Sequence, residues 1–168
     1  MQLEDLDTPV PVIDLDRVER NIEKLQTYLD AHGIKSRPHI KTHKLPALAY
    51  KQLEAGAIGI TCQKLSEAAV MAAAGIKDIL ITYNIIGRTK VEPLAQLARQ
   101  VNLSIAIDNE VALATITEAT RMAEKEIKVL VEFESGNQRV GVQTPEQAMR
   151  LARKISQESF LTFDGLMT

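Results

Sequence analysis

Segment 37–44, RPHIKTHK, gathers the side chains best suited to chemistry in this sequence. Side chains alternate along an extended strand, so one face of the segment would carry Arg37, His39, Lys41 and His43. A lysine buried among other cations loses its proton readily and becomes a nucleophile, as Schiff-base formation requires. The same cations, with Lys44, would attract a phosphorylated, anionic ligand. The segment therefore predicts a nucleophilic lysine beside an anion site.

Two other interpretations compete with this one. An exposed basic strand at the edge of a sheet accounts for the same residues equally well, because Lys and Arg are common there. A metal pair made by His39 and His43 would need a helix, and Pro38 and the strand-like context argue against a helix. The segment alone leaves the nucleophilic lysine and the basic surface strand as alternatives.

Short apolar runs rich in Val and Ile alternate with amphipathic stretches along the whole chain. This alternation predicts an α/β fold in which helices join the strands of a parallel sheet. We expect strands at 10–14, 34–43, 57–63, 78–84, 103–108, 127–134 and 160–168. We expect helices at 15–33, 45–56, 65–75, 91–100, 110–126 and 144–157, with Ser66 opening the third and Thr144 and Pro145 opening the last.

The first predicted strand is not followed by GxGxxG, which disfavours a dinucleotide-binding sheet. A complete eight-stranded barrel usually takes about 250 residues, whereas this chain has 168. The roughly six or seven predicted strands therefore favour a partial (β/α)8 TIM barrel.

Composition narrows the class of protein further. Hydrophobic residues make up 45% of the chain and charged residues 25%, which is typical of one globular domain. The formal net charge of -2 with interspersed signs predicts no nucleic-acid partner. The one cysteine, Cys62, lies in an apolar run and is expected in the core. The start of the chain lacks a secretory signal and no apolar run is long enough for a bilayer, so we expect a soluble, cytoplasmic protein without membrane contact.

Three segments together carry a resemblance to a known family: DTPVPVIDLDRVERNI (7–22), RPHIKTHK (37–44) and GAIGITCQKLSEA (56–68). They resemble the D-threonine aldolase and D-serine dehydratase family, fold-type III pyridoxal-phosphate (PLP) enzymes related to alanine racemase. The resemblance implies an alanine-racemase-like, PLP-binding barrel domain over residues 1–168. In that family the lysine of the PHxKTHK motif holds PLP as an internal aldimine, and the matching residue is Lys41.

Segment 131–142, VEFESGNQRVGV, resembles a second motif of the family. The motif's arginine hydrogen-bonds the phenolic oxygen of PLP, and Arg139 matches it. Arginine stays charged and donates in a fixed fork, which suits a phenolate. A turn at Gly136 and Asn137 with a solvent-facing arginine is the alternative.

Weaker cofactor-site candidates are His39, two residues from Lys41, and Gln63 and Asn84, at the ends of successive predicted strands. Polar residues without a function are also common at strand ends, so these three positions fit that interpretation equally well. Asp108 and Asn109 are interpreted as caps of the following helix.

The resemblance implies a PLP-dependent lyase that cleaves D-3-hydroxy amino acids, such as D-threonine to glycine and acetaldehyde, through a Schiff base on Lys41. A D-serine dehydratase-type ammonia-lyase, a PLP-binding homeostasis protein with little catalysis, and a non-enzymatic α/β domain are the alternatives. The resemblance also implies a divalent metal such as Mn²⁺, bound through a C-terminal β-domain that residues 1–168 do not include. We therefore expect this barrel domain to be incomplete and inactive by itself, and the full-length enzyme to be a homodimer acting on a small D-amino acid.

Overall fold

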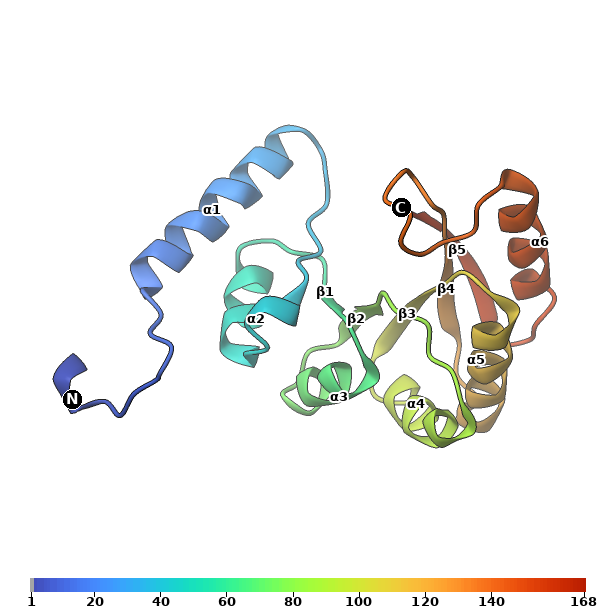
Figure 1. The fold of residues 1–168 in the computed structure, drawn as a ribbon, viewed down its shortest axis with the longest axis horizontal. Coiled ribbons are helices and arrows are strands. Elements are labelled where there is room, and N and C mark those ends of the chain that lie inside the picture. The colour runs from blue at the N-terminus through green and yellow to red at the C-terminus, as the bar shows by residue number, and fades with distance from the viewer. Residues whose placement is uncertain (1) are drawn as a thin grey trace.

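A computed structural model describes residues 2–168 of the chain. Its strands form one parallel sheet in which sequence neighbours pair in order from β1 to β5 (Figure 1). The strands are β1 (Ile60–Cys62), β2 (Asp78–Ile81), β3 (Asn102–Ile107), β4 (Ile127–Glu132) and β5 (Leu161–Met167). The helices are α1 (Leu15–Ala31), α2 (Pro46–Glu54), α3 (Leu65–Ala73), α4 (Val91–Ala98), α5 (Glu110–Ala123) and α6 (Pro145–Ser156).

Helices α3 to α6 cover the outer face of the curved sheet and enclose the core. Strand β4 shows the pattern most clearly, because Ile127 and Val129 are buried while Lys128 between them is exposed. On β5, Phe163 and Leu166 are exposed, although they pair with the buried Val129 and Val131 of β4, so the face that helices cover elsewhere is partly open at β5. One parallel strand followed by one helix, repeated around a curved sheet, confirms the predicted partial α/β barrel.

The strand predicted at 10–14 is wrong. Residues 10–14 have no regular structure, and Asp14 instead caps α1 by accepting the Arg17 N–H at 3.0 Å. Pro9 and Pro11 lack the N–H that a strand ladder needs, and no described strand pairs with the segment. In Figure 1 this segment and α1 lie apart from the sheet.

The strand predicted at 34–43 is also wrong beyond its middle. The carbonyls of Ser36 and Pro38 accept N–H groups of Ile58 and Thr61, so the chain runs beside β1 as far as His39. It then turns into a short 3-10 helix, Ile40–Thr42. The turn forms because the His39 Nδ1 accepts the Lys41 N–H, at 3.3 Å, in place of a strand partner.

The predicted helices are confirmed, with ends that differ by a few residues. Thr144 caps α6 in a capping box with Gln147, and Pro145 is its first residue, as predicted. The N-cap of α3 is Lys64 and not Ser66. Among residues 2–168, no helix has both the length and the apolar character needed to cross a bilayer.

Candidate active site

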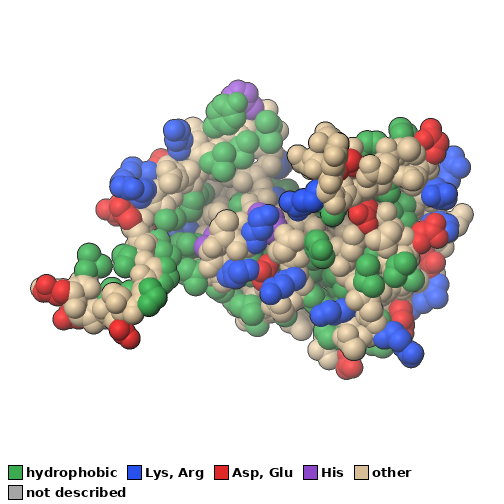
Figure 2. Space-filling model, in the orientation of Figure 1, with side chains coloured by type: hydrophobic (Ala, Val, Ile, Leu, Met, Phe, Trp, Pro, Cys, Tyr) green, Lys and Arg blue, Asp and Glu red, His purple; other side chains and the backbone are tan. Residues whose placement is uncertain are grey.

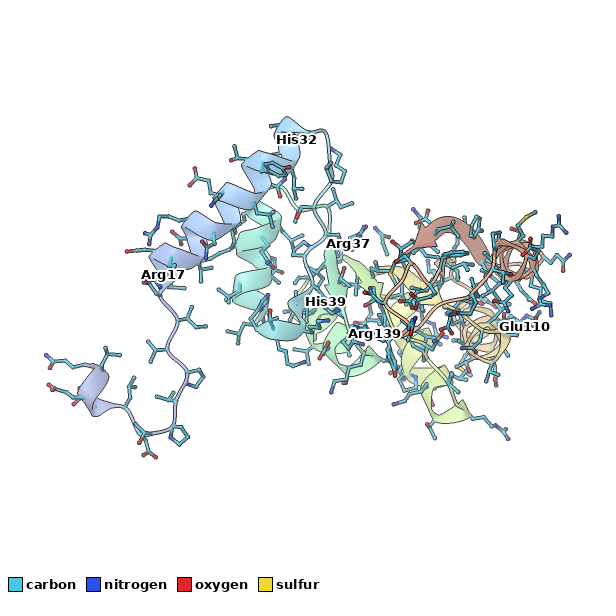
Figure 3. The ribbon with its side chains drawn as sticks, turned by 45° about the horizontal axis from the view of Figure 1, so that its top comes forward. Arg17, His32, Arg37, His39, Glu110 and Arg139 are labelled. Carbon is cyan, nitrogen blue, oxygen red and sulfur yellow. The ribbon has the colours of Figure 1, made fainter. Side chains whose placement is uncertain are left out.

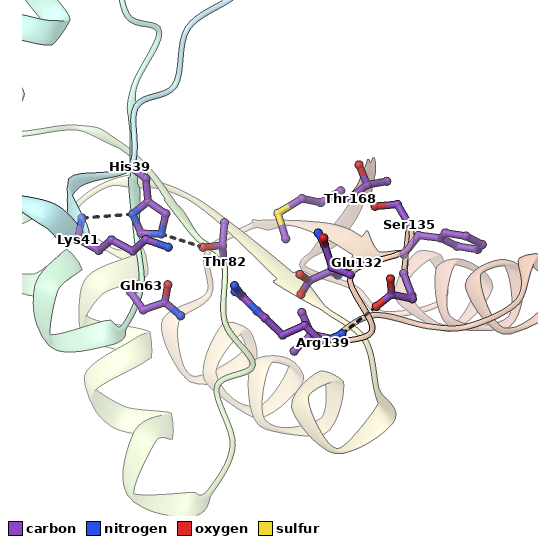
Figure 4. A pocket seen from close by; sticks show the side chains of 13 residues that line it. His39, Lys41, Gln63, Thr82, Glu132, Ser135, Arg139 and Thr168 are labelled. Atoms are coloured by element: carbon purple, nitrogen blue, oxygen red, sulfur yellow. Dashed lines mark hydrogen bonds between the residues drawn. The ribbon is translucent and has the colours of Figure 1, made fainter.

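A cleft of about 270 Å³ lies at the carboxyl ends of the strands, the side of an α/β barrel where reactive groups collect (Figure 4). Its residues come from the turn before β1, from the ends of β1, β2, β4 and β5, and from the loop after β4. They include His39, Lys41, Gln63, Thr82, Glu132, Glu134, Ser135, Asn137, Arg139, Met167 and Thr168. In Figure 2, Lys and Arg side chains gather near the middle of the molecule.

Lys41 reaches the cleft from the 3-10 turn. Ile40, fully buried, anchors the turn, and its carbonyl accepts the N–H groups of His43 and Lys44 at 3.2 and 2.8 Å. Lys41 itself is exposed. The expectation of a lysine on the buried face of a strand is therefore wrong, because the turn projects Lys41 to the mouth of the sheet.

The other cations of segment 37–44 do not line this cleft. Arg37 forms an ion pair with Asp78 at the start of β2, and Gly59 makes room for it, since a Cβ there would lie 2.8 Å from the Asp78 carbonyl oxygen. Lys44 forms an ion pair with Glu67, which is buried on α3. The pattern of residue types did not separate these structural cations from those in the cleft.

His43 turns away from the cleft, and its Nδ1 accepts the Leu45 N–H at 3.1 Å. Of the five candidates in the segment, the described structure places His39 and Lys41 in the cleft. The two histidines therefore do not share the cleft: His39 lines it and His43 does not.

His39 is half-buried beside Lys41, and its Nε2 lies 3.4 Å from the Thr82 hydroxyl (Figure 4). Burial is the main reason why the pKa of His39 is lowered, and the charge of Lys41 lowers it further, while a hydrogen bond with Gln63 opposes both. The imidazole is therefore neutral at pH 7 and able to donate one hydrogen bond and accept another.

Gln63 follows β1 and lies between the cleft and the ion pair of Lys44 with Glu67. Its N–H donates to Glu67 at 2.9 Å, and that carboxylate also pairs with Lys44. Burial tends to raise the pKa of Glu67, but the bonds from Lys44 and from the Gln63 N–H outweigh it and the net shift is downward. Glu67 thus fixes the main chain from which the Gln63 side chain enters the cleft.

Arg139 lies on loop 134–141 after β4, across the cleft from His39 (Figure 3). Its guanidinium points toward Thr82 and Gln63 (Figure 4). The Glu134 carboxylate organises the loop by accepting the N–H groups of Gly136 and Arg139, the latter at 3.0 Å. The pKa of Glu134 is lowered, chiefly by hydrogen bonds from the main chain at Gln138 and Gly136.

Glu132, at the end of β4, was missed by the sequence analysis. It is half-buried in the cleft, and burial raises its pKa, as do the charges of Asp108 and Glu134, against the opposing charge of Arg139. A carboxylate inside the apolar run VLVEF was the signal that could have identified it. Thr82, Ser135, Met167 and Thr168 were also missed and carried no comparable signal.

Asn84 does not line this cleft. Its Nδ2 donates to Asp108 Oδ1 at 2.8 Å, and its Oδ1 accepts the Asp108 N–H at 3.2 Å. Asn109 caps α5 as predicted, by accepting the Ala112 N–H at 2.9 Å, whereas Asp108 is not the cap. Cys62 is fully buried, and burial raises its thiol pKa to about 12, which confirms the prediction that it is a core residue.

A curved parallel sheet with a cleft of charged and polar side chains at its carboxyl edge defines the class as an α/β-barrel protein. The chain belongs to the family described as alanine racemase, N-terminal domain, whose model matches residues 13–168. It is 40% identical over 161 residues to a D-threonine aldolase of Arthrobacter sp., covering 96% of this chain and 42% of the aldolase. It is 33% identical over 168 residues to a 3-hydroxy-D-aspartate aldolase of Paracoccus denitrificans, covering 99% and 43%.

Solved structures give the same family. The crystal structure of D-threonine aldolase from Filomicrobium marinum matches with a TM-score of 0.94 and 41% identity, over 98% of this chain and 44% of that one. D-threo-3-hydroxyaspartate dehydratase from Delftia sp. HT23 matches with a TM-score of 0.83 and 35% identity, over 96% and 43%. The chain thus spans less than half the length of the relatives it matches.

Proposed function

We propose that this chain forms the cofactor-binding part of a PLP-dependent lyase that cleaves D-3-hydroxy amino acids, as in the cleavage of D-threonine to glycine and acetaldehyde. The observation that carries the proposal is that Lys41, just before β1, and Arg139, just after β4, line one cleft. The similarity to two aldolases of D-hydroxy amino acids supports the substrate class.

The side chains of the cleft fit the chemistry of PLP. The cofactor carries an aldehyde, which takes a primary amine, and a phenolic oxygen, which takes a charged hydrogen-bond donor. Lys41 supplies the amine and Arg139 the donor, and both line the cleft with Gln63 and His39. When bound, PLP supplies an electron sink for the charge that develops on the substrate.

The residues of this chain orient the reacting groups and keep their charges apart. Arg139 would present a permanent positive charge to the phenolic oxygen, because a guanidinium does not exchange its proton near pH 7. His39 stays neutral and places an uncharged polar ring next to Lys41. Glu132 binds a proton more readily than an ordinary glutamate, because burial and the charges of Asp108 and Glu134 raise its pKa against the charge of Arg139.

A divalent metal such as Mn²⁺ does not fit residues 2–168. They contain no group of three or more His, Cys, Asp or Glu side chains arranged to hold an ion. Metal dependence therefore stays a prediction for the full-length protein.

Elimination of the β-hydroxyl as water, followed by hydrolytic release of ammonia, is the second candidate reaction, favoured by the 37% identity over 147 residues to the D-threo-3-hydroxyaspartate dehydratase of Delftia sp.. Both reactions would use Lys41 and Arg139 in the same places. The products distinguish them, since an aldolase releases glycine and an aldehyde, whereas a dehydratase releases a keto acid and ammonia.

The test is a Lys41→Ala variant of the full-length protein, with Lys35→Ala as the matched control. Lys35 is an exposed lysine a few residues upstream that does not line the cleft. After incubation with PLP and reduction with borohydride, we expect a covalent adduct on the peptide containing Lys41 in the wild type and in Lys35→Ala. We expect none in Lys41→Ala, together with loss of product formation from D-threonine.

An adduct of unchanged yield in Lys41→Ala would overturn the assignment of the lysine. Pyruvate and ammonia from D-serine, without glycine from D-threonine, would replace the aldolase by the dehydratase. Persistence of the adduct without either set of products would favour a protein that only holds the cofactor.

A further inference from the structure

Asp108, directly after β3, ties together the carboxyl ends of three neighbouring strands. Its Oδ1 accepts from Asn84, after β2, at 2.8 Å and from Asn109 at 2.7 Å. Its Oδ2 accepts the N–H of Gly141, in the loop after β4, at 2.9 Å. The two oxygens of one half-buried carboxylate therefore hold β2 and the loop after β4 at fixed positions relative to β3.

The bond to Gly141 acts on the loop that carries Arg139. Two main-chain bonds close the base of that loop: the Val142 N–H donates to the Glu132 carbonyl at 2.8 Å, and the Glu134 N–H donates to the Val142 carbonyl at 3.0 Å. Inside the loop, the Glu134 carboxylate accepts the N–H groups of Gly136 and Arg139. Of these bonds, the one from Gly141 to Asp108 is the bond that fixes the loop to a neighbouring strand.

We propose that Asp108 is a positioning residue for Arg139: its carboxylate, clamped by Asn84 and Asn109, holds Gly141 and thereby sets where the Arg139 guanidinium enters the cleft. The inference rests on the proposed function, in which that guanidinium contacts the cofactor. It assigns to Asp108 a task different from the helix cap that its sequence position indicates.

The electrostatics require a carboxylate at this position. Three donors converge on Asp108, and an amide side chain would direct its own N–H₂ group at one of them. Burial tends to raise the pKa of Asp108, but the bonds from Gly141, Asn109 and Asn84 outweigh it and lower the pKa, so the group is ionised at pH 7. Its charge also acts on Glu132, whose pKa it raises beside Arg139.

The first test measures the loop itself, before any cofactor is added. Arg139 is an exposed trypsin site inside the loop, so the cleavage rate after Arg139 reports how well the loop is held. We expect Asp108→Asn to raise that rate roughly tenfold. The control is Asp14→Ala, which removes the N-cap of α1 far from the cleft and should leave cleavage after Arg139 unchanged.

The second test is a double-mutant cycle on PLP affinity in the full-length protein. We expect Asp108→Asn to raise the dissociation constant of PLP roughly tenfold when Arg139 is present, and to have little effect in an Arg139→Ala background. Loss of a merely structural contact would weaken binding equally in both backgrounds. Asp108→Glu, which keeps the charge, should recover part of the affinity that Asp108→Asn loses.

Equal effects in both backgrounds, or unchanged cleavage after Arg139, would overturn the role of Asp108. That result is distinct from failure of the proposed function, in which the wild type itself would form no adduct with PLP. A wild type that binds PLP through Lys41 with additive Asp108 and Arg139 effects would keep the function and remove only the positioning role.

Discussion

Segment 37–44 places Lys41 in the cleft on a short turn flanked by ion pairs. Loop 134–141 places Arg139 in the same cleft, and this loop is held by main-chain N–H groups that donate to carboxylates. In the first region the fixed partners are side chains: Arg37 with Asp78 and Lys44 with Glu67. In the second, the Glu134 and Asp108 carboxylates accept main-chain N–H groups of the loop. The two regions thus reach the same cleft by different means.

This difference predicts different weaknesses. Ion pairs with exposed partners contribute little to stability, because water competes for both charges. Main-chain bonds to a carboxylate depend on the exact path of the backbone and on an ionised acceptor. We therefore expect backbone changes in the Arg139 loop to cost more stability than the loss of either ion pair beside the Lys41 turn.

The largest effect is expected from Gly141→Ala in the Arg139 loop. Gly141 has a φ of +104°, and a Cβ there would lie 2.6 Å from the Glu134 nitrogen and 2.8 Å from the Phe133 carbonyl carbon. Both the strain and the clash involve backbone, so we expect a loss of about 3 kcal/mol in the free energy of unfolding. Thermal melting followed by circular dichroism measures it.

Gly136→Ala is the matched control for that change. Gly136 lies in the same loop with a φ of +119°, but a Cβ there would meet nothing within 4 Å. It therefore carries the strain without the clash, and we expect about half of the effect or less. Equal losses for the two variants would show that the close approach of Gly141 to β4 does not matter.

Periodicity predicted the fold well where hydrophobic burial decides the structure. The strands at 57–63, 78–84, 103–108, 127–134 and 160–168 and all six helices form, because their apolar residues meet in one core. Residues 10–14 are as apolar as those strands and yet form none. A strand needs a partner as well as a pattern, and the pattern of one segment does not report its partner.

The candidate site was predictable at the residues whose types are unusual and not at those that act by position. Lys41, His39, Gln63 and Arg139 all line the cleft. Asp108 and Asn84 looked like a cap and a strand-end amide, because their bonds reach residues 24 and 33 positions away along the chain. Only the pairing of β2, β3 and β4 brings these residues together.

A smaller effect is expected from Glu67→Gln beside the Lys41 turn. Glu67 is buried and accepts from Lys44 and from the Gln63 N–H, and its pKa is lowered. Its ionised form therefore stabilises the fold above the unfolded-state pKa, and this stability is lost as the pH falls through the folded-state pKa. At pH 7 we expect Glu67→Gln to cost about 1–2 kcal/mol of unfolding free energy.

Urea unfolding of the wild type and of Glu67→Gln between pH 7 and pH 3 tests this. The difference between the two proteins should shrink as the pH falls below about 4, because the wild-type carboxylate then becomes protonated. A difference that stays constant down to pH 3 would mean that packing, and not the charge of Glu67, stabilises the turn.

The smallest effect is expected from Asp78→Asn, which removes the partner of Arg37. The side chains are 39% and 23% exposed, so the pair should contribute no more than about 1 kcal/mol at low salt. At 1 M salt the Debye length falls to about 3 Å, and the difference from the wild type should nearly disappear. Asp108→Asn, measured in parallel, should keep its effect at high salt, because its main-chain donor is a dipole held inside the fold. A salt-independent loss for Asp78→Asn as large as that for Asp108→Asn would remove the distinction between the two regions, since both would then be held by desolvated charge.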